Sequence, residues 1–188
     1  MVVSTEMVQR WGGGGHGVPL TLQEFLADRG MGGVEPRPAA DLAQVPVRAA
    51  RIPAEEFAAL DCEVDTDDLL RLRCSGGFSF IDLCHRRWPA QQVPAVDAVV
   101  LPRDRDHVRQ VLDLASAKGW AVVPFGGGTS VVDGVDVTDR LTIGVALWEM
   151  NAVQHLDAES GEVRVQAGIS GPELERWLEA RGFTWGHV

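Results

Sequence analysis

Residues 120–135 read WAVVPFGGGTSVVDGV, and this stretch decides the fold. Its three consecutive glycines, Gly126 to Gly128, stand between two runs rich in valine. A glycine loses more backbone entropy on ordering than an alanine, about 0.5–1 kcal/mol, so three in a row need a reason. Taken alone, the pattern is consistent with a turn between strands and with a binding loop.

The residues before the glycines predict a strand, a helix and a second strand. DAVVLP (97–102) and WAVVPF (120–125) are typical of short buried strands. Between them, DRDHVRQVLDLASAKG (104–119) places its apolar residues on one helical face, with Asp104 as the N-cap and Gly119 as the stop. This βαβ unit predicts parallel strands and a right-handed crossover.

The pattern continues after the loop. LTIGVALW (141–148) predicts another strand, and residues 151–168 predict a hairpin because valines alternate on its return. SGPELERWLEARG (170–182) predicts a helix, since Ser170 and Glu173 have the spacing of a capping box and the leucines form an apolar stripe.

The chain before residue 96 reads differently. Proline and glycine interrupt it often, and the segments 21–30, 53–60 and 66–74 predict short helical or mixed elements. Residues 75–88 are ambiguous between helix and strand. Residues 1–95 are therefore expected to form a mainly helical extension.

The loop's position favours a binding role. It follows a strand of a βαβ unit, and ligands in α/β sheets sit beyond the carboxyl ends of the strands. Without side chains, Gly126 to Gly128 can bring successive N–H groups close to an anion, and Thr129 and Ser130 add hydroxyl donors. Because no basic residue lies between Lys118 and Arg140, we expect amides and hydroxyls, not a cation, to hold a phosphate here.

Two familiar phosphate motifs do not fit. A Walker loop needs a lysine after its last glycine, and none is present. A dinucleotide fingerprint needs a third glycine where Val131 stands, followed by a helix, whereas the residues after Ser130 are apolar and rich in turn formers.

A more specific resemblance covers most of the chain. Residues 97–135 resemble the FAD-binding segment of the vanillyl-alcohol oxidase/PCMH flavoprotein family, and PFGGGTS is most similar to its alkyldihydroxyacetonephosphate synthase-like branch of bacterial FAD-linked oxidases. RLRCSGGFSFIDL (71–83) is similar to the segment that precedes the domain in that branch. AGISGPELERWLEARGFTWGHV (167–188) resembles the stretch that leads to the family's second flavin-contacting motif.

The resemblance implies an α+β fold, with the first half of a PCMH-type FAD-binding domain in residues 96–188 after the extension 1–95. It implies that the FAD diphosphate is wrapped by seven residues: Pro124, Phe125, Gly126, Gly127, Gly128, Thr129 and Ser130. In covalently flavinylated relatives a histidine bonds the flavin. Gly128 stands at the corresponding place, so FAD is expected to be noncovalent.

The implied activity is that of a flavin-dependent oxidoreductase acting on a small hydroxylated substrate. Two alternatives stay open: an alkylglycerone-phosphate synthase-like flavoenzyme, and a truncated, non-catalytic module of the same fold. The family's catalytic residues lie downstream of this region, and the chain ends at GFTWGHV like a domain cut partway. A second copy of the chain, in a homodimer of the full-length protein, is the expected protein partner.

Composition narrows the setting. The net charge of −10 argues against nucleic acid or an anionic membrane surface as partner. No apolar run approaches the roughly 20 residues of a membrane span, and no leader is evident, which predicts a cytoplasmic protein. The three cysteines form no CxxC pair, so no metal site is expected.

Two residues near the loop and the end of the chain raise separate questions. Asp133 replaces the glycine that the synthase-like branch carries, and its carboxylate either faces solvent in a turn or repels the diphosphate. His187 sits where the family chain passes toward the flavin, and it is either structural or a flavin neighbour.

Overall fold

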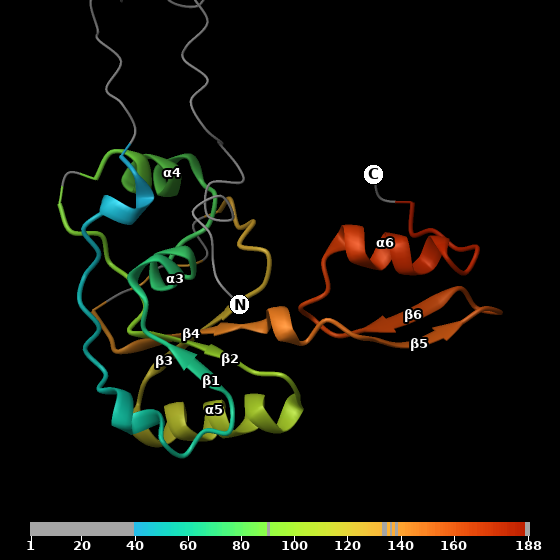
Figure 1. Cartoon of the computed structure of the whole chain (residues 1–188), viewed down its shortest axis with the longest axis horizontal. Helices are drawn as coiled ribbons and strands as arrows, with labels where there is room; N and C mark the ends of the chain where they lie inside the picture. The colour runs from blue at the N-terminus through green and yellow to red at the C-terminus, as the bar shows by residue number, and fades with distance from the viewer. Residues whose placement is uncertain (1–39, 90, 133–134, 136, 138, 187–188) are drawn as a thin grey trace, which may run out of the picture.

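The computed structural model describes residues 40–89, 91–132, 135, 137 and 139–186 (Figure 1). The predicted helix at 21–30, Asp133 and His187 lie outside these residues. In the described part, a four-stranded sheet has one long helix on one face and two shorter helices on the other, and a hairpin with a further helix follows beyond the end of the sheet (Figure 1).

The sheet has the strand order β1-β2-β4-β3, with bounds β1 Glu63–Asp65, β2 Ala98–Leu101, β4 Thr142–Ala146 and β3 Ala121–Phe125. Strands β2, β4 and β3 are parallel, which confirms the predicted βαβ pairing direction, and β4 lies between the two predicted partners. Every residue of β2 and β4 is buried, as expected for parallel strands covered on both faces. The strand predicted to reach residue 148 ends at Ala146 because η4 (Leu147–Glu149) turns the chain.

Helix α5 (Arg105–Lys118) has the predicted caps. The Asp104 carboxylate accepts from the amides of Asp106 and His107, each at 2.9 Å. Gly119 closes the helix in the left-handed region at φ +70°, where a side chain would be strained. The apolar face of α5 covers one side of the sheet together with Phe57 of η3 (Ala54–Phe57) and Trp120.

The other side of the sheet is covered by the chain that precedes it. Helix α3 (Asp68–Arg73) packs Leu70 against β2, and α4 (Phe80–Arg87) follows after a short bend. The ambiguous segment is thus helical from Phe80 onward, because Ser79 and Asp82 form a reciprocal capping box. A short η2 (Leu42–Gln44) packs beside α3. The described part of the extension is mainly helical, with β1 as its one strand.

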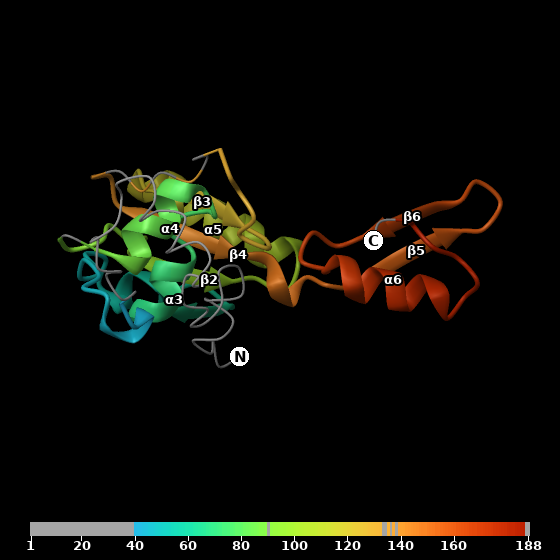
Figure 2. The same cartoon turned by 90° about the horizontal axis from the view of Figure 1, so that it is seen from above.

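The last part of the described chain forms a separate layer at the end of the sheet (Figure 2). Strands β5 (Val153–Asp157) and β6 (Glu162–Val165) pair as the predicted hairpin. Helix α6 (Gly171–Glu179) packs along them and begins at the predicted capping box, in which the Glu173 carboxylate accepts from the Ser170 amide at 3.0 Å.

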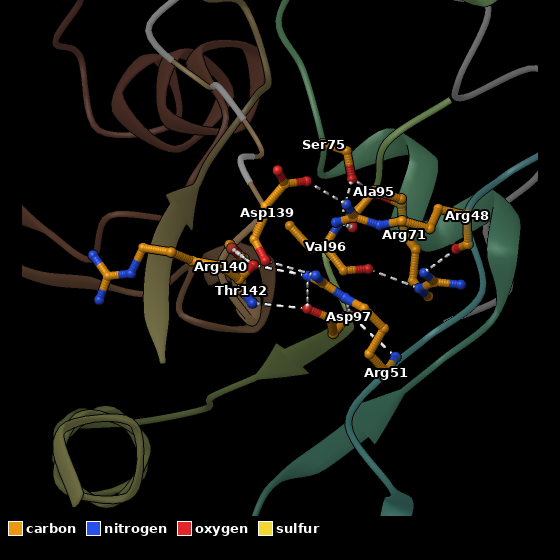
Figure 3. Close-up of polar contacts among 10 residues, drawn as sticks. All are labelled: Arg48, Arg51, Arg71, Ser75, Ala95, Val96, Asp97, Asp139, Arg140 and Thr142. Atoms are coloured by element: carbon orange, nitrogen blue, oxygen red, sulfur yellow. Dashed lines mark hydrogen bonds and ion pairs between the residues drawn. The ribbon is translucent and has the colours of Figure 1, made fainter. Parts of the chain in front are cut away.

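One fully buried carboxylate joins three parts of the chain (Figure 3). Asp97, just before β2, accepts from Nε and Nη2 of Arg51, each at 2.8 Å, and from the Thr142 amide at 2.8 Å. Burial by itself raises the pKa of Asp97, but these hydrogen bonds and the Arg51 charge hold it below its usual value. The carboxylate is therefore charged and ties the extension to β2 and β4.

A second arginine binds the extension to the same place (Figure 3). The Arg71 side chain is buried, and it donates to the carbonyls of Val96 at 2.8 Å and Arg48 at 2.5 Å. The Ser75 hydroxyl accepts from the Val96 amide at 2.8 Å. Chain on both sides of residue 96 thus contributes to one sheet, and the domain boundary placed there stays a prediction.

We expect Asp97→Asn to lower the free energy of unfolding at pH 7 by about 2–3 kcal/mol. The amide leaves Arg51 without a counter-charge, and the loss is below that of a fully buried pair because Arg51 is 30% exposed. Since the folded pKa of Asp97 is lowered, its contribution is present above the unfolded pKa near ~3.9 and disappears as the pH falls through the folded pKa.

Urea unfolding between pH 7 and pH 2 checks this, because the difference between wild type and Asp97→Asn should shrink below about pH 4. Asp139→Asn is the matched control: its side chain is fully exposed, and Arg51 contacts only its carbonyl. It should change stability by less than about 0.5 kcal/mol. A stability difference between wild type and Asp97→Asn that stays constant with pH contradicts the charged state assigned to Asp97.

Candidate functional site

A cavity of about 390 Å³ lies at the carboxyl ends of β3 and β4. Three parts of the chain line it: the glycine loop 126–129 with Trp148, residues from the stretch 73–86, and the turn 167–171 before α6. Parallel strands present ligands at this end, so the cavity occupies the position that the sequence predicted.

The near end of the loop is fixed by Trp148, which follows β4. Its indole Nε1 donates to the Gly126 carbonyl at 2.7 Å, and its ring meets Phe125 edge-on with centroids 5.8 Å apart. The guanidinium of Arg73 stacks over the same indole, 4.2 Å from the ring centroid. The indole thus holds the first glycine in place from η4, which follows the neighbouring strand β4.

The far end of the loop is fixed by the extension. The Ser130 carbonyl accepts from the Phe78 amide at 2.5 Å. A Cβ on Gly77 would lie 2.1 Å from this carbonyl oxygen, so only glycine permits the two backbones to approach this closely. Both carbonyls at the loop's ends therefore point at protein donors.

The structure requires glycine at only one of the three glycine positions of the loop. Gly128 has φ +70°, and a Cβ there would lie 2.4 Å from Cζ of Phe125, so the fold itself requires it. A Cβ on Gly126 would meet nothing within 4 Å, and one on Gly127 would meet only a Thr129 methyl at 3.6 Å. The protein's own packing does not explain these two glycines, and open space lies above them.

The loop amides are available to a ligand. The backbone hydrogen bonds between described residues, outside the helices and strands, include none donated by Gly126, Gly127 or Gly128. Successive N–H groups in such a loop form a concave site for an anion. Of the seven predicted residues, Phe125 and 126–129 line the cavity, whereas Pro124 lies in β3 before the loop and Ser130 follows it, with its carbonyl bound by the Phe78 amide.

The position of Pro124 in an edge strand explains why a proline is tolerated there. It lies in β3, which is the edge strand of the sheet, and the Ala121 amide donates to the Leu141 carbonyl at 2.8 Å. Alternation along the strand then turns the Pro124 nitrogen away from β4, so its missing N–H removes no ladder bond.

Two arginines line the cavity beside the loop, and the expectation that amides and hydroxyls hold a phosphate there stays a prediction. Arg73 at the end of α3 and Arg86 in α4 both line the cavity, although they precede the loop by about 40 to 50 residues in sequence. Local sequence around the loop does not show which distant residues lie beside it in the fold. The stretch RLRCSGGFSFIDL (71–83), which resembles the family's segment before the domain, contains Arg73 but ends before Arg86.

Arg86 is the more unusual of the two. Its side chain is 7% exposed, and its Nη2 has no hydrogen-bond partner within the part of the chain that the structure describes. Burial lowers the pKa of Arg86, partly offset by the negative charge of Asp82. The guanidinium lies over the Phe78 ring, 5.8 Å from its centroid.

The turn before α6 approaches the sheet through another glycine. A Cβ on Gly168 would lie 1.7 Å from the Leu147 carbonyl oxygen, and the Gly168 amide donates to the Met150 carbonyl at 2.8 Å. This contact places Ser170 and Gly171, at the start of α6, in the cavity wall opposite the glycine loop.

Other kinds of site lack support in the described residues. No three histidine, cysteine or acidic side chains gather there as metal ligands would, and no helix has the length and hydrophobicity needed to cross a membrane. Cys74 packs in the core beneath the cavity, and burial raises its pKa to about 12, so its thiol is not a nucleophile.

Comparison with known proteins identifies the class. Residues 96–188 match the sequence profile of the FAD binding domain, so this part of the chain is an FAD-binding domain and its cofactor is FAD. The chain belongs to the vanillyl-alcohol oxidase/PCMH-type family of FAD-linked oxidoreductases and related enzymes.

The relatives agree with this assignment. An alkyldihydroxyacetonephosphate synthase from Trypanosoma brucei brucei is 35% identical over 130 residues, covering 66% of this chain and 21% of the relative. The mitochondrial D-2-hydroxyglutarate dehydrogenase of Arabidopsis thaliana is 30% identical, over 55% of this chain and 18% of the relative. The chain thus spans about a fifth of the length of these curated relatives.

Solved structures share the fold. An alkyldihydroxyacetonephosphate synthase superposes with a TM-score of 0.74 and 26% identity, over 88% of this chain and 33% of the synthase. p-Cresol methylhydroxylase superposes with a TM-score of 0.54 at 15% identity, over 73% of this chain and 27% of that one, which supports the PCMH-type fold.

We expect Gly128→Ala to lower the free energy of unfolding by about 2–4 kcal/mol, because alanine is strained at positive φ and its methyl group overlaps Phe125. Gly126→Ala is the matched control and should change it by less than about 1 kcal/mol, since its Cβ meets open space. Thermal or urea unfolding without added FAD compares them. Equal losses at both positions contradict the division of the loop into a structural and a ligand-facing part.

Proposed function

We propose that the loop Pro124–Ser130 holds the FAD diphosphate noncovalently, and that the protein carrying this domain oxidises a small hydroxylated substrate. The observation that carries the proposal is the loop Gly126 to Gly128, which lines a cavity at the carboxyl ends of parallel strands and whose amides donate no backbone hydrogen bond to the described residues outside the helices and strands. FAD supplies the chemistry when bound, since its ring accepts a hydride from such substrates.

The residues present fit a diphosphate. Trp148 and the extension hold the loop's end carbonyls at Gly126 and Ser130, which directs acceptors to protein donors and leaves amides for an anion. Absence of a side chain at Gly127 lets the backbone approach phosphate oxygens closely. The chain's own role is to bind and orient the cofactor.

The noncovalent attachment rests on Gly128. This residue stands where covalently flavinylated members of the family carry a histidine, and its positive φ and contact with Phe125 exclude a side chain. A protein of this sequence should therefore release its flavin on denaturation.

A second candidate function is that of an alkylglycerone-phosphate synthase-like flavoenzyme. It is favoured by the 35% identity to the trypanosomal synthase and by the synthase superposition at a TM-score of 0.74. The oxidoreductase reading is supported by the dehydrogenase relative. The two differ in whether the overall reaction oxidises the substrate.

Gly127→Val tests the loop. The valine side chain occupies the space that phosphate oxygens would take, so we expect the affinity for FAD to fall by at least about 100-fold, the loss of several charge-assisted hydrogen bonds. Titration of FAD into the purified protein, followed by flavin fluorescence, measures it. Gly127→Ala should give an intermediate loss. An unchanged affinity in the valine variant shows that the loop is only a turn.

Anaerobic mixing of the flavin-loaded protein with small 2-hydroxy acids tests the reaction. Bleaching of the flavin absorbance, with one equivalent of oxo acid formed, is the outcome expected of an oxidoreductase. A protein that retains oxidised flavin with every 2-hydroxy acid, yet converts an acylated dihydroxyacetone phosphate and a long-chain alcohol into the alkyl ether with release of the carboxylate, is a synthase. That result overturns the first proposal and supports the second.

A further inference from the structure

We propose that Arg86 is an anion-binding residue of this cavity and pairs with the FAD diphosphate from the side opposite the loop amides. The inference rests on the proposed diphosphate site and extends it to a side chain of the extension. The sequence alone does not indicate this role, because Arg86 lies 40 residues before Gly126.

The first argument is the state of the guanidinium. Arg86 is 93% buried, and its Nη2 meets no hydrogen-bond acceptor among the described residues. Burying a charged donor without a partner is destabilising, so such groups are normally paired. The carboxylate whose negative charge acts on it is Asp82, whose Oδ2 accepts from the amide and hydroxyl of Ser79 at 3.2 and 2.8 Å, and no ion pair joins Asp82 to Arg86.

The second argument is the direction of the side chain. Arg86 lines the same cavity as loop residues 126–129. A Cβ on Gly76 would lie only 2.7 Å from its Nη2, so the absence of a side chain at Gly76 makes room for the guanidinium. The Phe78 ring supports it from one side, at 5.8 Å.

The third argument is charge complementarity. A diphosphate brings two negative charges into a protein whose net charge is −10, and the loop amides supply hydrogen bonds but no opposite charge. Arg86 supplies a fixed positive charge with a planar set of donors, which suits phosphate oxygens. Arg73, stacked on Trp148 in the same cavity, adds a second positive charge near the loop.

A ligand-binding role and a structural role of Arg86 predict different effects on the stability of the ligand-free protein. If Arg86 serves a ligand, then the ligand-free protein holds an uncompensated charge, and removing that charge does not harm the ligand-free fold. If Arg86 is instead a structural element, its removal destabilises the ligand-free protein. Arg86→Met separates the two, since methionine keeps an unbranched apolar side chain without the charge.

The experiment measures the affinity of the purified protein for FAD, ADP and riboflavin by calorimetry, and its melting temperature without ligand. For Arg86→Met we expect about 10- to 100-fold weaker binding of FAD and ADP, which carry the diphosphate, at an unchanged affinity for riboflavin. The melting temperature without ligand should be unchanged or raised. Arg86→Lys should recover part of the loss, because it restores the charge without the planar donors.

Two further variants sharpen the result. Arg87→Met is the matched control, because it removes the same charge from the same helix at a residue that does not line the cavity, and it should leave all three affinities within about twofold. Gly76→Ala displaces the guanidinium without removing it, and should weaken FAD and ADP binding while riboflavin binding is kept.

The outcomes distinguish this inference from the proposed function. Wild-type protein that binds neither FAD nor ADP overturns both. Wild-type protein that binds them while Arg86→Met binds equally well overturns the role of Arg86 and leaves the loop site intact. A melting temperature without ligand that falls in Arg86→Met, with FAD and ADP affinities reduced no more than riboflavin affinity, makes the guanidinium a structural group and overturns the inference.

Discussion

The buried carboxylate of Asp97 is the interaction on which the rest of the arrangement depends. It receives Arg51 from the extension and the Thr142 amide from the start of β4, while its own amide donates to the Thr142 carbonyl at 2.6 Å. These contacts set the position of β4 beside β2. Trp148 follows the other end of β4 and contacts the glycine loop. The position of β4, which the Asp97 contacts set at one end of the sheet, therefore also places Trp148 against the loop at the other end.

The extension takes part in the site. Its helix α3 and the bend after it bring Gly77 and Phe78 against the Ser130 carbonyl, and Trp148 holds the Gly126 carbonyl from the opposite side. A short loop with both end carbonyls engaged loses conformational freedom, which in the proposed site orients its amides before the diphosphate binds. Preorganised dipoles of this kind bind an anion without the further cost of ordering the loop.

Several glycines around the cavity are required for different structural reasons. Gly128 is required by a positive φ and by the Phe125 ring, and Gly77 and Gly168 by the close approach of a carbonyl oxygen. Gly126 and Gly127 meet no such neighbour, so packing within the described protein does not require glycine at either position. The sequence alone does not distinguish the three loop glycines, because it does not show which residues lie next to each of them in the folded protein.

Local sequence determined much of this protein. The caps of α5 and α6, the hairpin β5-β6, the parallel direction of β2 and β3 and the position of the loop at a strand's carboxyl end all follow from signals within a few residues, since caps, turns and hydrophobic periodicity act at short range. Tertiary structure alone decided that β4 lies between β2 and β3, that β1 joins the sheet, and that Arg73 and Arg86 reach the cavity. These depend on burial and charge between segments far apart in the chain, where packing selects the partner, and no local pattern encodes that choice.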